Sequence, residues 1–170
     1  QEGAIYSKEE SLKIKQLNGK QLSYNNYNDI FSALVISKSL PKNTGTVIVK
    51  HANPCGVSIN KNYLKSYQLA LASDPISAFG GVVSCNFKIK PKLAQELNKL
   101  FLEVIVGNGI EKNALKIFKK KKNLRVIDAS KLSIKNLESV VFNFGNFLMQ
   151  NADINSLSIK NFRVVSKKKP

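Results

Sequence analysis

Short apolar runs alternate with segments of helical spacing along most of this chain. Runs rich in Val and Ile predict buried strands at 47–49, 82–83, 104–106 and 124–127. Apolar residues three and four positions apart predict helices at about 30–40, 61–73, 91–101 and 111–121, with Pro91 in the first turn of the third helix. Strands that alternate with helices indicate an α/β fold, a three-layer structure whose mostly parallel sheet carries helices on both faces.

The stretch 46–58, TVIVKHANPCGVS, carries the candidate chemistry. Lys50 and the chain's one histidine, His51, follow the first apolar run directly. Neighbouring residues of a regular strand point to opposite faces, so these two side chains can act together only where the backbone leaves strand geometry. The turn-forming NPCG sequence predicts that departure, with Gly56 free to adopt a positive φ. Ligands of open α/β sheets bind outside the carboxyl ends of strands, so we expect the site there.

Two further segments contain candidate ligand-binding residues. Gly80 and Gly81 open the strand at 82–83, which predicts close backbone approach to a ligand and free N–H groups for an anion. A tight loop packed by Phe79 is the alternative interpretation. Glu103 directly precedes the run at 104–106 and is able to accept hydrogen bonds from a polar ligand. A carboxylate there also fits a solvated strand edge or a partner for a neighbouring helix.

The pattern changes beyond residue 131. Short strands are predicted at 140–142, 147–149 and 162–165, with turns at Gly145 and 151–155. A further short strand is predicted at 4–6. The strands after residue 131 fit either an antiparallel addition to the sheet or an arm that pairs with a partner.

Composition limits the class of protein. The chain has 170 residues, 43% of them hydrophobic, which suits one domain. We expect no membrane span, because no apolar run approaches the necessary length, and we expect a cytosolic location in which Cys55 and Cys85 stay reduced. The net charge of +16 raises nucleic acid as a partner. Only 2 of the 27 basic residues are Arg and the lysines are dispersed, so we expect no nucleic-acid binding.

Several motifs together resemble one family. They are VIVKHANPCGV, ALASDPISAFGGVV, LEVIVGNG and ALKIFKKKKNLRVI, and the likeness runs from LNGKQLSYNN to FRVVSKKKP. The chain resembles the transformylase portion of the family that joins aminoimidazole carboxamide ribonucleotide (AICAR) formyltransferase to inosine monophosphate cyclohydrolase. The resemblance implies that 1–170 is a single domain, the first of two cytidine-deaminase-like units, with the second unit and the cyclohydrolase domain outside it. It also implies a homodimer whose active site forms between subunits.

The resemblance assigns roles residue by residue. Lys50 and His51 match the catalytic lysine and histidine, and Gly80 and Glu103 match positions that hold the aminoimidazole nucleotide, where the family often has Asp for Glu103. Neighbouring residues included as substrate-binding are Ser77, Phe79, Gly81 and Asn53. The implied co-substrate is 10-formyltetrahydrofolate, and no metal is implied. The sequence departs from the family at 107–109, where an alanine and proline pair is expected.

The implied chemistry suits these side chains. A neutral imidazole is able to take a proton from the weakly nucleophilic amino group of AICAR as that group attacks the formyl carbon. The Lys50 ammonium is able to stabilise the negative charge that develops on the formyl oxygen.

Two alternatives stay open. A zinc deaminase is suggested by the HANPCG sequence, but such enzymes need Glu two residues after the His and a P-C-x-x-C motif. Asn53 and Ser58 stand at the Glu and second Cys positions. The other alternative is a fragment that assembles with a partner without catalysis.

Overall fold

The computed structural model describes residues 13–132, 139–143, 145–150, 163–165 and 167–168. The chain divides into two units, Gln1–Ser133 and Ile134–Pro170, and each is described by itself. Within the described residues, no helix combines the length and the apolar character that a membrane span requires.

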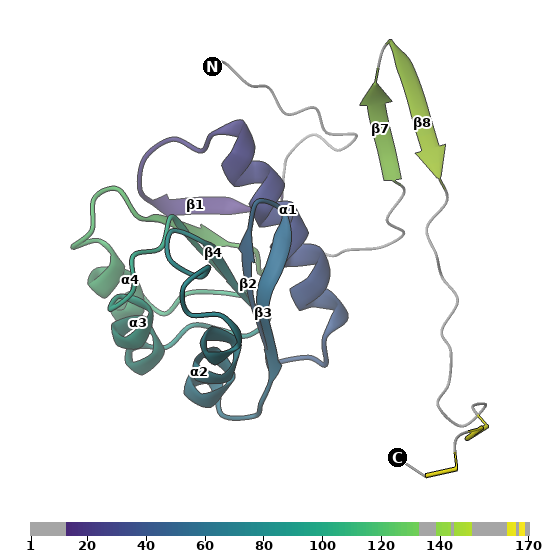
Figure 1. The fold of residues 1–170 in the computed structure, drawn as a ribbon. Helices are drawn as coiled ribbons and strands as arrows, with labels where there is room; N and C mark the ends of the chain where they lie inside the picture. The colour runs from purple at the N-terminus through teal and green to yellow at the C-terminus, as the bar shows by residue number, and fades with distance from the viewer. Residues whose placement is uncertain (1–12, 133–138, 144, 151–162, 166, 169–170) are drawn as a thin grey trace. The chain divides into compact units, whose positions relative to one another are not determined.

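The first unit is built on a six-stranded sheet (Figure 1). Its strands are β1 (Lys15–Asn18), β2 (Gly45–Lys50), β3 (Asn53–Ile59), β4 (Val82–Cys85), β5 (Val104–Gly107) and β6 (Arg125–Asp128), in the spatial order β1-β6-β5-β4-β2-β3. The α/β prediction is confirmed. The sheet is mixed and not mostly parallel, because parallel pairing joins only β4, β5 and β6, whereas β1 runs antiparallel to β6 and β2 runs antiparallel to both of its neighbours. Only two residues join β2 to β3, too few for the crossover that parallel neighbours need.

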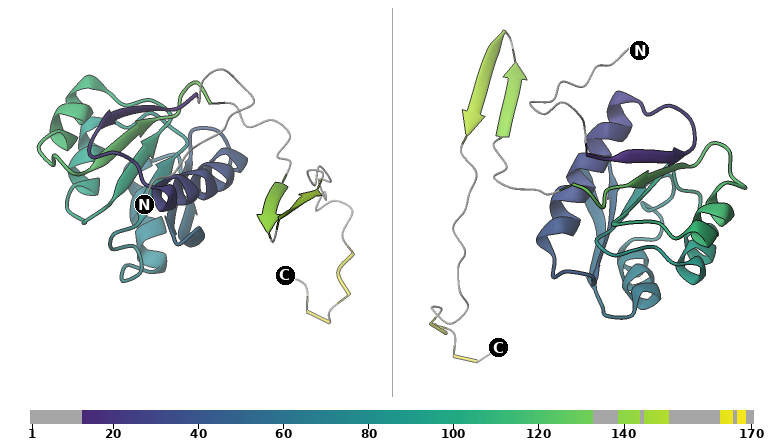
Figure 2. Two further views of the ribbon diagram at one scale, coloured as in Figure 1. Left: turned by 90° about the horizontal axis from the view of Figure 1, so that it is seen from above. Right: turned by 180° about the vertical axis from the view of Figure 1, so that it is seen from behind.

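Helices cover both faces of this sheet (Figure 2). They are α1 (Tyr24–Ser39), α2 (Tyr63–Ser73), α3 (Pro91–Leu97) and α4 (Lys112–Phe118). Every second strand residue joins one core cluster with α2, α3 and α4, and these residues are Ile48, Val83, Cys85, Ile105 and Val126. The residues between them are equally buried and face α1, as the 2.8 Å contact between the Ser37 and Ser84 hydroxyls shows. The three-layer prediction is therefore confirmed.

Local signals explain where the helices begin and end. Ser23 and Asn26 form a reciprocal capping box at the start of α1, and α1 ends before Leu40. Pro91 occupies the first turn of α3, as predicted. That helix ends at Leu97, however, so the predicted extent to residue 101 is too long, and Phe101 is exposed.

Strand β3 replaces the turn that the NPCG sequence predicts. Pro54 and Gly56 lie within β3, paired antiparallel with β2, and Gly56 has no positive φ. The prediction that Gly56 provides the departure from strand geometry is wrong. Glycine is needed there because α2 crosses closely, and a Cβ would lie 2.0 Å from the Ala70 carbonyl oxygen.

The second unit contains a hairpin of β7 (Ser139–Asn143) and β8 (Asn146–Gln150), with Gly145 at φ 78° in the turn. The strands predicted at 140–142 and 147–149 and the Gly145 turn are confirmed. The strand predicted at 162–165 is wrong for 163–165, which have no regular structure. The features predicted at 4–6 and 151–155 lie outside the described residues.

Gly56→Ala is expected to lower the free energy of unfolding by about 3 kcal/mol, because β3 or α2 must shift to admit the methyl group. Urea denaturation measures the change. The control is Val57→Ala at the next, 41% exposed position of the same edge strand, which should cost much less. Equal losses from the two substitutions would contradict the close approach of α2.

Tyr67→Phe is expected to stabilise the protein by about 1 kcal/mol at pH 7, because the buried hydroxyl has no hydrogen-bond partner among the described residues. Burial, with a smaller contribution from Glu96, raises the pKa of Tyr67 to about 12. Tyrosine in the unfolded chain ionises near pH 10, so this group leaves the free energy of unfolding unchanged below pH 10 and lowers it as pH rises toward 12. Denaturation at pH 7 and pH 11 should show a smaller alkaline loss for Tyr67→Phe; identical losses would contradict this account.

Candidate active site

The turn between β2 and β3 places Lys50 and His51. Lys50 pairs with Asn53, and the two loop residues between them, His51 and Ala52, both have positive φ, 53° and 60°. The predicted departure from strand geometry is confirmed, but it lies in this turn and not at Gly56. Two positive φ values suit a tight hairpin turn, in which Asn-Gly is the favoured pair. Each non-glycine residue held there costs about 1 kcal/mol.

The turn lies at the carboxyl end of β2, as predicted. Because β2 runs antiparallel to β4, that end lies beside the start of β4, where Val49 pairs with Val82. Val82 in turn pairs with Val104 of β5. The predicted position at the carboxyl ends of the parallel strands is therefore wrong, since the turn lies at their amino ends.

Lys50 and His51 differ in their surroundings. The Lys50 side chain is half-buried, and its Nζ donates to the Phe79 carbonyl oxygen at 2.7 Å. His51 is exposed, and its imidazole makes no hydrogen bond to any residue that the structure describes. Asn53 donates from Nδ2 to the His51 carbonyl oxygen at 2.9 Å, so this side chain supports the turn.

The loop before β4 is closed by its own hydrogen bonds. The Ser77 N–H donates to Asp74 Oδ1, and the hydroxyl and N–H of Ser77 lower the pKa of Asp74. The Gly80 N–H donates to the Phe101 carbonyl at 2.9 Å, and the Gly81 N–H donates to Ala78 at 3.0 Å. The prediction of free backbone N–H groups for an anion is therefore wrong. The loop is tight, as the alternative interpretation expects, although Phe79 is 56% exposed and its ring lies tilted against the Phe101 ring, with the centroids 5.1 Å apart.

Glu103 joins this loop to helix α1. Its N–H donates to the Gly81 carbonyl at 3.1 Å. Its carboxylate Oε2 accepts from Asn26 Nδ2 at 2.9 Å and lies 3.9 Å from Arg125. The Arg125 Nε donates to Gln21 at 3.1 Å, which orients the guanidinium. The carboxylate is thus held in place while it remains open to solvent.

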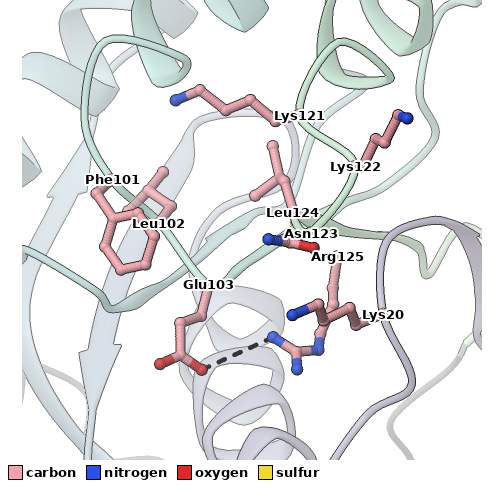
Figure 3. Close-up of a pocket in the computed structure, with 9 residues that line it drawn as sticks. All are labelled: Lys20, Phe101, Leu102, Glu103, Lys121, Lys122, Asn123, Leu124 and Arg125. Carbon is pink, nitrogen blue, oxygen red and sulfur yellow. Dashed lines mark ion pairs between the residues drawn. The ribbon is translucent and has the colours of Figure 1, made fainter.

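A cavity of about 480 Å³ opens beside Glu103 (Figure 3). Its walls are formed by Lys20, Phe101, Leu102, Glu103, Lys121, Lys122, Asn123, Leu124 and Arg125. In Figure 3 the Glu103 carboxylate and the Arg125 guanidinium point toward each other at its lower end. The Lys121 ammonium already donates a hydrogen bond to the Asn98 carbonyl oxygen at 2.6 Å. Lys50 and His51 are not part of this cavity wall.

Helix α1 connects the two parts of the site. Asn26 and Asp29 lie three residues apart and so share one face of the helix. Asn26 binds Glu103, whereas Asp29 Oδ1 accepts from the Ala52 N–H at 2.7 Å. One helix face thus contacts both the turn that carries His51 and the carboxylate beside the cavity.

The two thiols are not arranged around the turn as a metal site. Cys55 Sγ lies 3.6 Å from the Ile48 carbonyl oxygen, and burial raises the pKa of its thiol. Cys85 is buried in the core, where burial raises its pKa to about 12. Within the described part of the chain, no three His, Cys, Asp or Glu residues are grouped so that they could hold a metal ion.

The comparisons with known proteins identify the family. The family model described as the AICARFT/IMPCHase bienzyme matches residues 1–170. This chain belongs to the AICARFT/IMPCHase bienzyme family. The resemblance stated from the motifs is therefore confirmed.

Curated relatives agree with this assignment. The bifunctional purine biosynthesis protein PurH of Acetivibrio thermocellus is 40% identical over 162 residues, covering 92% of this chain and 31% of the relative. PurH of Thermoanaerobacter sp. is 40% identical over 163 residues, covering 93% and 31%, and PurH of Leptospira biflexa is 37% identical over 160 residues, covering 93% and 31%. The chain spans about a third of the length of these relatives.

A solved structure of Acinetobacter baumannii RibD, form 2, has a TM-score of 0.44 and 16% sequence identity to this chain. The match covers 61% of this chain and 36% of the RibD chain. At that distance the likeness carries no argument about function.

Sequence reasoning missed three residues of this candidate site. Asn26, Asp29 and Arg125 contact predicted site residues or the turn that carries them. A signal for Asn26 exists in its spacing from Ser23, three residues earlier, because the two form the capping box of α1. The chain is rich in Asn, however, so the YNNYND sequence alone does not indicate which side chains point inward.

Asn26→Ala is expected to lower the free energy of unfolding by about 1–2 kcal/mol, because it removes the partner of the Ser23 N–H and of Glu103. Chemical denaturation of the chain measures this loss. Asn25→Ala, at the exposed neighbouring position of the same helix, should change stability by less than about 0.5 kcal/mol. The account of Asn26 fails if both variants unfold at the same denaturant concentration.

Proposed function

We propose that this chain is the first part of an AICAR transformylase, which transfers the formyl group of 10-formyltetrahydrofolate to the amino group of AICAR. Membership of the family supports the reaction class. The observation that carries the proposal is the left-handed turn, which presents the exposed His51 beside a Lys50 ammonium bonded to the Phe79 carbonyl. The parent protein would also carry inosine monophosphate cyclohydrolase activity outside these residues.

In this mechanism His51 is the general base. The AICAR amino nitrogen forms a bond to the formyl carbon, and the bond from that carbon to N10 of the folate breaks. His51 takes the proton released by the amino group and returns it to the departing N10. The His51 imidazole is exposed and makes no hydrogen bond to the described residues, so its ring nitrogens are available for this transfer.

Lys50 stabilises charge in the same step. Attack places negative charge on the formyl oxygen, and an ammonium nearby lowers the energy of that state. An ammonium has three N–H donors, and one of them is used by the Phe79 carbonyl. Two donors therefore remain for substrate atoms.

Glu103 and the neighbouring cavity hold the nucleotide in this proposal. Oε2 of Glu103 is occupied by Asn26, which leaves Oε1 to accept from a hydroxyl of the ribose. The volume of about 480 Å³ lies in the usual range for a small-molecule site. Gly80 and the adjacent residues Ser77, Phe79, Gly81 and Asn53 belong to the substrate-binding surroundings of Lys50 and Glu103.

The remaining parts of the proposal concern partners. Residues 1–170 act as one domain, the first cytidine-deaminase-like unit, and work within a cytosolic homodimer. The folate contacts come chiefly from chain outside these residues. A zinc-dependent deaminase finds no support in the relatives named above, which are purine biosynthesis proteins. A fragment that assembles without catalysis is an outcome of the experiment that follows.

The experiment replaces the matching segment of the Acetivibrio thermocellus relative by this chain and measures folate-dependent formylation of AICAR. His51→Ala and Lys50→Ala are each expected to lower kcat by about 100-fold or more, because they remove the base and the oxyanion-stabilising cation. Lys61→Ala, an exposed lysine beyond β3, is the matched control and should retain activity.

Normal turnover in the His51→Ala or Lys50→Ala chimera would remove that residue from the mechanism. If the unsubstituted chimera folds and binds AICAR but does not formylate it, the assembly alternative is favoured. Isothermal titration of the 170-residue chain with AICAR tests separately whether these residues contain a nucleotide-binding site.

A further inference from the structure

The turn at His51 and Ala52 is not favoured by its own sequence. A two-residue loop with two positive φ values is formed most readily by Asn-Gly or Asp-Gly, and alanine has no side chain with which to stabilise that conformation. The local hydrogen bond from Asn53 reaches the His51 carbonyl and leaves the Ala52 N–H free for another acceptor. The turn therefore needs support from outside the hairpin.

Asp29 supplies that support. Its Oδ1 accepts from the Ala52 N–H at 2.7 Å, a short bond of the kind that a charged acceptor makes. The residue after it, Ile30, is fully buried, and Ala33 and Leu34 anchor the same helix to the sheet. Asp29 therefore lies on a helix that is packed against the core. The turn to which it is hydrogen bonded lies at the end of a strand.

We infer that Asp29 is a positioning residue for His51, which holds the turn so that the imidazole stays at the reacting amino group. The inference rests on the proposed function, because it takes His51 as the base. Asp29 itself touches no substrate in this account, since its role is exerted through the Ala52 N–H. Loss of the anchor leaves the turn free to relax toward ordinary φ values, which moves the imidazole while the strand stays paired.

The first test is nuclear magnetic resonance of the 170-residue chain, in which His51 is the sole histidine and its ring signals need no separation from others. Asp29→Ala should speed hydrogen exchange of the Ala52 amide by about tenfold or more and lower the heteronuclear NOE of His51. Asp29→Asn keeps an oxygen acceptor and should resemble the unsubstituted chain. Asn28→Ala, at an exposed position of the same helix, is the control.

The second test measures formylation by the chimera described above. Asp29→Ala should lower kcat by about tenfold to 100-fold with little change in KM for AICAR, because the base is displaced while Glu103 is untouched. Adding Ala52→Gly should restore much of the loss, since glycine favours the positive φ without an anchor. Asp29→Asn should stay close to the unsubstituted rate.

The outcomes separate this inference from the proposed function. If Asp29→Ala changes neither the hydrogen exchange of the Ala52 amide nor the heteronuclear NOE of His51, Asp29 does not hold the turn, and this result does not depend on which reaction the protein catalyses. A mobile turn with an unchanged kcat would overturn the positioning role. If the unsubstituted chimera is inactive but Asp29→Ala still makes the turn more mobile, the proposed function is wrong. The role of Asp29 in holding the turn is then still supported. A purely structural role predicts that Ala52→Gly fails to rescue kcat, which would also overturn the inference.

Discussion

The candidate site depends on one local constraint, which is that a buried strand must stop and reverse within two residues. Both of those residues, His51 and Ala52, take left-handed backbone conformations that side chains disfavour by about 1 kcal/mol each. The antiparallel pairing of β2 with β3 and the hydrogen bond from the Ala52 N–H to Asp29 offset this cost. The same reversal carries Lys50 and His51 out of the alternation in which they would face opposite sides of the sheet.

Strand direction decides what lies beside this turn. Because β2 is inserted antiparallel between β3 and β4, its last residues meet the loop that precedes β4. A Cβ at Gly81 would lie 3.0 Å from the Val49 carbonyl oxygen, so only a very small residue permits this approach. The parallel pairing of β4 and β5 then aligns Glu103 with Gly81, to which it is hydrogen bonded. Three segments distant in sequence, the turn after β2, the loop before β4 and the start of β5, thereby lie together at one end of the strands.

Helix α1 connects these segments through hydrogen bonds. Its apolar face packs on the sheet through Ile30 and Leu34, while Asn26 and Asp29 reach the carboxylate and the turn respectively. The helix therefore serves both as a core element and as the support of the polar groups.

The sequence by itself determined the elements whose signals are local. Buried Val and Ile runs marked β2, β4, β5 and β6, and Pro91 marked the first turn of α3. The motifs around Lys50 and Glu103 also predicted the family and the candidate residues. Only the tertiary structure decided that β2 runs antiparallel, that the NPCG sequence is a strand, and that Asp29 reaches Ala52. Direction, pairing and approach depend on contacts between residues far apart in the chain, which periodicity cannot encode.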